Sequence, residues 1–140
     1  MSMWLNVARV SPRALAKMQR EEALVEALFF GEGAEADQAR KELEMEADHT
    51  AGMDYLLARE QMETMSRALG GSVKGDPVID DLGVSGELEY EAGYGPAFFL
   101  DPEAVRNALT ESTTLEFDSE VASLFAEAAQ DGQFVVAVVS

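Results

Sequence analysis

The sequence contains no cysteine and a single histidine, His49. The absence of thiols excludes disulfides, thiolate chemistry and zinc sites with sulfur ligands. With one imidazole and no Gly-x-Ser-x-Gly elbow, the chain lacks the usual residues of a nucleophilic triad. Glu44 and Asp48 stand one helical turn apart beside His49, but without a second histidine this spacing favours a solvated helix surface over a metal site. The sequence therefore predicts no catalytic residue, no metal ion and no cofactor.

Long apolar runs are also missing. No run approaches the roughly 20 apolar residues that cross a bilayer, and the first ten residues lack the apolar core of a signal peptide. We therefore expect a soluble cytoplasmic protein that has no membrane partner.

Basic residues are scarce, with 10 Lys and Arg against 27 Asp and Glu, for a net charge of −17. Residues 1–75 hold 13 acids and 9 bases, a net charge of −4, whereas residues 76–140 hold 14 acids and only Arg106, a net charge of −13. Such a field repels phosphate backbones, so no nucleic-acid partner is expected. Two interpretations remain: the charge serves solubility alone, or it steers in a cationic protein partner.

The N-terminal half predicts one strand followed by helices. Alternating apolar side chains indicate a strand over residues 3–10, and the Ser-Pro pair that follows is typical of a helix N-cap and first turn. The helical pattern runs to residue 30 with a break near Glu21. Residues 36–69 are rich in helix formers, and the His-Thr-Ala-Gly run at 49–52 is expected to divide them into two helices.

The C-terminal half predicts turns, one short strand and two capped helices. Residues 72–91 are interpreted as mostly irregular because of their Asp and Gly content. After a tight turn, residues 97–100 are expected to form a strand, and Asp101 and Asp118 are expected to cap two helices. The residues of the predicted turn are Gly93, Gly95 and Pro96.

The last apolar run, residues 133–139, does not alternate and therefore predicts a strand buried on both faces, at the centre of a sheet. Such a strand needs helices on at least one side. The expected fold class is α/β (α+β): one small domain over residues 1–140, with a short mixed sheet that includes strands 3–10 and 133–139 and about four to five packed helices.

The run Gly93-Tyr-Gly-Pro-Ala97, with the Asp-Pro-Glu-Ala-Val segment after it, resembles the YfbM-like family, catalogued as domain of unknown function 1877. The N-terminal strand, the Asp54-Tyr-Leu-Leu57 segment and the Val-rich C-terminal end are similar to the same family, so the resemblance touches most of the chain. The family has no assigned general activity. Some members occur beside toxins in interbacterial-competition loci, which implies an immunity role as one hypothesis.

The chain departs from the family at polar positions. Phe98 stands where family members typically have Arg, and Ala51 and Asp54 lie near positions where they have His. A segment between residue 118 and the last helix is also missing. If those polar residues form a site in the family, the resemblance implies that most of it is absent here.

The first functional hypothesis is a non-enzymatic acidic binding protein: an immunity protein that binds and neutralises a cognate cationic toxin. Its acidic patch would attract the partner and two tyrosines at the centre would anchor it. The residues predicted to bind the partner are Asp80, Asp81, Glu87, Glu89, Tyr90, Glu91 and Tyr94.

The alternative hypothesis is a small-ligand-binding or weakly enzymatic housekeeping protein. It predicts a concave pocket lined by Tyr55, Tyr94 and Phe98. A third hypothesis is a structural homodimer that uses apolar surface near Phe98 and Phe99, so that the sequence leaves monomer and homodimer open.

Overall fold

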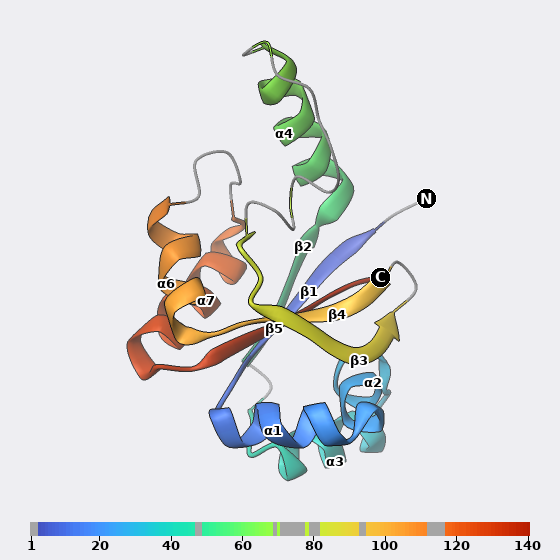
Figure 1. Cartoon of the computed structure of the whole chain (residues 1–140). Helices are drawn as coiled ribbons and strands as arrows, with labels where there is room; N and C mark the ends of the chain where they lie inside the picture. The colour runs from blue at the N-terminus through green and yellow to red at the C-terminus, as the bar shows by residue number, and fades with distance from the viewer. Residues whose placement is uncertain are drawn as a thin grey trace.

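In the computed structural model, residues 3–46, 49–68, 70, 78, 82–92, 95–111 and 117–140 are described, and they form a sheet with helices on both of its faces (Figure 1). The five strands lie in the order β2-β1-β5-β4-β3. Every pairing between them is antiparallel, so the α+β class is confirmed and the expected mixed sheet is corrected. The strands are β1 (Trp4–Val10), β2 (Thr50–Asp54), β3 (Gly86–Ala92), β4 (Gly95–Leu100) and β5 (Phe134–Val139).

The C-terminal strand β5 lies at the centre of the sheet, as its uninterrupted apolar run predicted. It pairs with β1 from Leu5↔Val139 to Val10↔Phe134, and with β4 on its other side. The side chains at 135–138 are fully buried. Since successive side chains of a strand point to opposite faces, both faces of β5 must be covered by helices.

One face of the sheet is covered by three helices, α1 (Pro12–Arg20), α2 (Glu22–Phe30) and α3 (Ala34–Glu42), at the lower end of Figure 1. Ser11 caps α1 as predicted, its Oγ accepting from the Ala14 amide at 3.1 Å. The predicted break at Glu21 and the predicted stop at Gly31 are confirmed. The apolar sides of these helices pack on Ala8, Val10, Leu88, Ala97, Val136 and Val138.

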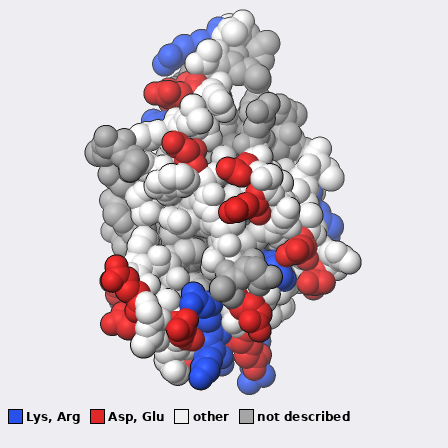
Figure 2. All heavy atoms as spheres, turned by 180° about the vertical axis from the view of Figure 1, so that it is seen from behind, with Lys and Arg blue, Asp and Glu red and all other residues white. Residues whose placement is uncertain are grey.

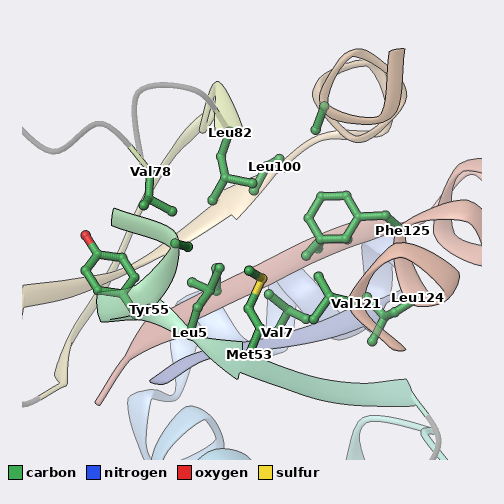
Figure 3. Packing of buried hydrophobic residues seen from close by; sticks show 14 of the residues in the cluster. Leu5, Val7, Met53, Tyr55, Val78, Leu82, Leu100, Val121, Leu124 and Phe125 are labelled. Carbon is green, nitrogen blue, oxygen red and sulfur yellow. The ribbon is translucent and has the colours of Figure 1, made fainter. Parts of the chain in front are cut away.

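The other face is covered by α4 (Tyr55–Ala68), α6 (Pro102–Glu111) and α7 (Ser119–Asp131). Asp101 caps α6 with a 2.8 Å hydrogen bond from the Ala104 amide, and Asp118 caps α7, as predicted. Gly132 ends α7 at φ +64°, a left-handed conformation that favours glycine. Figure 3 shows Phe125 of α7 pointing into this core, towards Leu100. None of the described helices is long and apolar enough to cross a bilayer.

Two strands were missed by the sequence reading. Residues 50–54, expected as a helix break, form the edge strand β2, which pairs with β1 from Trp4↔Asp54 to Ala8↔Thr50. Residues 86–92, expected to be irregular, form the opposite edge strand β3. Gly86 is not a turn residue: it lies beneath the ring of Phe99, where an added Cβ would come within 2.8 Å of ring carbons. The segment 77–79 falls mostly outside the described residues, and only Val78 of it is seen, buried in the core.

Arg9 is the charged residue with the least exposed surface among those described, at 9%. Its Nη1 donates to Gln133 Oε1 at 2.8 Å, and its Nε lies 3.3 Å from Glu127 Oε2 without the alignment of a hydrogen bond. Asp131 lies 3.6 Å from the same guanidinium. A cation at the C-terminal end of α7 also complements the helix dipole. The carboxylates of Glu127 and Asp131 on α7 thus both lie close to the Arg9 guanidinium of the same chain.

We predict that Phe125→Ala lowers the free energy of unfolding by about 3–5 kcal/mol, because it leaves a cavity where a fully buried ring stacks on Phe117 at 4.8 Å. Urea unfolding followed by circular dichroism would measure the change. Leu57→Ala is the matched control: that side chain is 53% exposed, and its loss should change stability by about 0.5 kcal/mol or less. Equal effects of the two substitutions would contradict this packing.

Candidate protein-binding surface

The alternation of β3 separates its side chains into two sets. Leu88 is buried against the α1–α3 layer, whereas Glu87 and Glu89 on either side of it are exposed. Because neighbouring side chains of a strand point to opposite faces, the two glutamates lie on the α6–α7 side of the sheet. Glu87 pairs in register with Phe98 of β4. The sheet thus brings Glu87 and Glu89 together, as expected for residues two apart.

The helices on this side carry further exposed carboxylates. They come from the N-terminal turn of α6 and from both ends of α7, and Arg106 of α6 is the one base among the described residues of 82–140. We call the exposed carboxylates of β3, α6 and α7 the acidic face. Its residues are Glu87, Glu89, Glu103, Asp118, Glu120, Glu127 and Asp131.

Acidic residues are not confined to one small patch. Figure 2 shows Asp and Glu side chains spread over the rear of the molecule from top to bottom, while the Lys and Arg side chains gather mainly at its two ends. The described bases of the N-terminal half belong largely to α1, α3 and α4. The charge asymmetry of the sequence is therefore kept on β3, α6 and α7, whereas α4 on the same face of the sheet carries Arg59 and Arg67.

Tyr90 does not lie at the centre of the acidic face, which corrects its expected position. It packs against the α1–α3 layer, with its ring centroid 6.3 Å from that of Phe30. Burial raises the pKa of its phenol above the usual 10.0, and the carboxylates of Glu26 and Glu22 on α2 raise it further. Tyr90 thus belongs to a different surface from Glu87 and Glu89.

The structure describes some of the other predicted residues and not the rest. Asp80, Asp81, Gly93 and Tyr94 lie outside the described residues. Gly95 and Pro96 are the first residues of β4 and pair with Ala92 and Glu91 of β3. The backbone of Glu91 belongs to β3, the strand that also carries Glu87 and Glu89.

The pocket expected for the small-ligand hypothesis is not formed by its described residues. Tyr55 is only 2% exposed and is part of the core beside Val78, as Figure 3 shows. Phe98 is half-buried, and Phe99 packs on Gly86 and on the ring of Phe134 at 6.4 Å. The Phe98–Phe99 pair is therefore not the open apolar surface expected for a homodimer contact.

Other grooves occur among the described residues, and two of them are well formed. The smaller, of about 410 Å³, lies between β2 and α7, with Ser119, Glu120 and Ser123 on one wall and Thr50 and Ala51 on the other. The larger, of about 770 Å³, lies between α2 and α3. We call it the α2–α3 groove; Phe30, which contacts Tyr90, stands at its edge.

The sequence reading missed the α2–α3 groove. The sequence predicted only one helical pattern up to residue 30, on which Leu24, Val25 and Leu28 face the core. A second stripe, at Ala23, Ala27 and Phe30, follows the same helical spacing on the neighbouring side. In the part of the chain that the structure describes, no three His, Asp or Glu side chains are grouped so as to hold a metal ion.

The comparison with family models gives one match, to the domain of unknown function DUF1877, and it extends over residues 1–136. No curated protein and no solved structure matches the chain in the corresponding comparisons.

The position of Tyr90 makes a prediction about its titration. Glu26→Gln should lower the pKa of Tyr90 towards its ordinary value, because it removes a nearby negative charge. The measurement is the ultraviolet absorbance of the phenolate against pH, with Tyr90→Phe to identify the signal. Glu60→Gln on α4 is the control and should leave the titration unchanged. As the folded-state pKa is the higher one, this tyrosine's contribution to stability is complete below pH 10 and is lost as the pH rises through the folded-state value.

Proposed function

The chain belongs to the family of the domain of unknown function DUF1877, and we propose that this member is an immunity-type protein that binds and neutralises a cationic toxin. In this proposal the protein acts by binding alone. The acidic face attracts the toxin and covers the basic surface through which the toxin would contact its own target.

The observation that supports the proposal is the placement of charge. Seven exposed carboxylates of β3, α6 and α7 lie on one side of the sheet, and Arg106 is the one base among the described residues of 82–140. Glu127 and Asp131 are partly neutralised by Arg9. The remaining carboxylates have no described ion pair, so their field extends into solvent and favours encounter with a positive surface.

A charge distribution of this kind also has simpler uses. Exposed glutamates on an edge strand oppose pairing with the edge of another sheet, and a high net charge favours solubility. Solubility would be served by acids anywhere on the surface, and edge pairing would be opposed by a charge of either sign on β3. The binding proposal is distinct because it requires negative charge at Glu87 and Glu89, and it is tested at these positions.

We predict that the tagged protein, incubated in lysate of its own cells, captures one stoichiometric protein at low salt and less of it at high salt, since exposed charges are screened. The captured protein should inhibit growth when expressed alone, and co-expression of the present protein should restore growth. An empty lane, or a captured protein that does not affect growth, would overturn the proposal.

The double variant Glu87→Lys/Glu89→Lys should slow association with the captured protein by about tenfold or more, because steering raises association rates by roughly 10–1,000-fold. Surface plasmon resonance would give the rate, and the growth assay would give protection. The matched control is Glu46→Lys/Glu60→Lys, which changes the net charge equally at exposed positions away from the acidic face. Equal slowing by both pairs would mean that association depends on the net charge of the protein and not on the position of Glu87 and Glu89.

A further inference from the structure

The α2–α3 groove combines an apolar floor with an acidic rim. Both helices that form it are nine residues long, which corresponds to about 13 Å of helix. Its volume is about 770 Å³, and α3 packs on α2 beside it. Its lining residues are Ala23, Leu24, Glu26, Ala27, Phe30, Gly31, Ala34, Glu35, Gln38, Ala39 and Glu42.

The floor of the groove admits close approach of another backbone. Ala23, Ala27 and Ala34 supply small side chains, so a helix laid against them could reach the interaxial distance of roughly 8–10 Å found between packed helices. Phe30, 39% exposed, stands at the end of α2 against the ring of Tyr90. An exposed aromatic ring held by a second ring is a typical anchor of a protein contact.

The rim of the groove is negative. Glu26, Glu35 and Glu42 line it, and its described lining contains no Lys or Arg. Two bases close to the groove in sequence have partners: Arg40 pairs with Asp37, and Lys17 Nζ donates to the Glu42 carbonyl at 2.8 Å. Lys41 is exposed next to Glu42 on α3 but does not line the groove. Glu22 and Glu26 also act together on the Tyr90 phenol, which places their charge beside the aromatic anchor.

We propose that the α2–α3 groove docks an amphipathic, cationic helix of another protein. The apolar side of that helix would pack on the alanines and on Phe30, and Lys or Arg side chains flanking it would pair with Glu26 and Glu35. A second copy of this chain fits poorly, because its net charge of −17 repels itself. The groove lies on the opposite side of the sheet from the acidic face, so this inference goes beyond the proposed function and does not depend on it.

The test uses a fluorescent synthetic helix made of Leu and Lys, with Leu at i, i+3, i+4 and i+7, and measures its binding to the full chain by fluorescence anisotropy. Phe30→Ala and Glu26→Lys/Glu35→Lys should each weaken binding about tenfold or more, the loss typical of an anchor residue. Glu60→Lys/Glu63→Lys on α4 has the same change in net charge on the other side of the sheet, outside the acidic face, and should change affinity by less than about twofold. A peptide of the same composition with scrambled order should bind at least about tenfold more weakly than the amphipathic one.

Three outcomes would overturn the inference: no binding by the unaltered protein, equal binding of the scrambled peptide, or equal loss in the two charge-reversed pairs. A second measurement does not rely on the stability of those variants. Benzoylphenylalanine in place of Gln38, which lines the groove, should cross-link the peptide on illumination, whereas the same group in place of the exposed Gln61 on α4 should not. Cross-linking from Gln61 alone would place the peptide elsewhere. Failure here leaves the growth assay of the acidic face unaffected, so the two proposals are tested separately.

Discussion

The pairing of the last strand with the first is the contact on which the rest of the structure depends. β5 enters the sheet between β1 and β4, and the backbones of Trp4 and Ser140 exchange hydrogen bonds of 2.8 and 3.0 Å. Residues more than a hundred positions apart must meet before either helical layer has a complete surface to cover. The fully buried side chains of β5 serve both layers, since neighbouring residues belong to opposite cores. Neither core can be assembled without this strand.

This topology also explains how charge along the sequence becomes charge in space. After β1 the chain builds the α1–α3 layer, and after β4 it builds α6 and α7 on the other face before returning as β5. The acidic C-terminal half is therefore laid mostly on one side. A charge excess confined to half of a sequence could have been mixed by a different strand order. Here it is preserved in part because α6 and α7 follow one another on the same face of the sheet.

The sequence reading succeeded where a local signal and the tertiary structure agree. The caps at Ser11, Asp101 and Asp118 depend only on their own helix starts, and the Val-rich run could be satisfied only by a buried strand. β2 was missed because Gly52 and Asp54 have low strand propensity and lie between helix formers, so its formation depends on pairing with β1. β3 contains the alternation Glu87-Leu-Glu-Tyr90, but the Asp and Gly residues that surround it in the sequence favour turns. The same period of two places Tyr90 on the other face of the sheet from Glu87 and Glu89, so the predicted patch could not contain all three side chains.

The edge strand β3 thus connects two surfaces of different character. On one side it carries Glu87 and Glu89 towards solvent, and on the other it carries Tyr90 against α2 and Phe30. Its register with β4 also shifts between Glu87 and Glu91, which interrupts the regular row of backbone groups that an added strand would need. A partner is therefore better recognised here through side chains than through strand addition. In the two proposals, the charge of the acidic face gives a fast encounter of low specificity, whereas the α2–α3 groove gives shape complementarity and an aromatic anchor. The strand β3 separates these two surfaces.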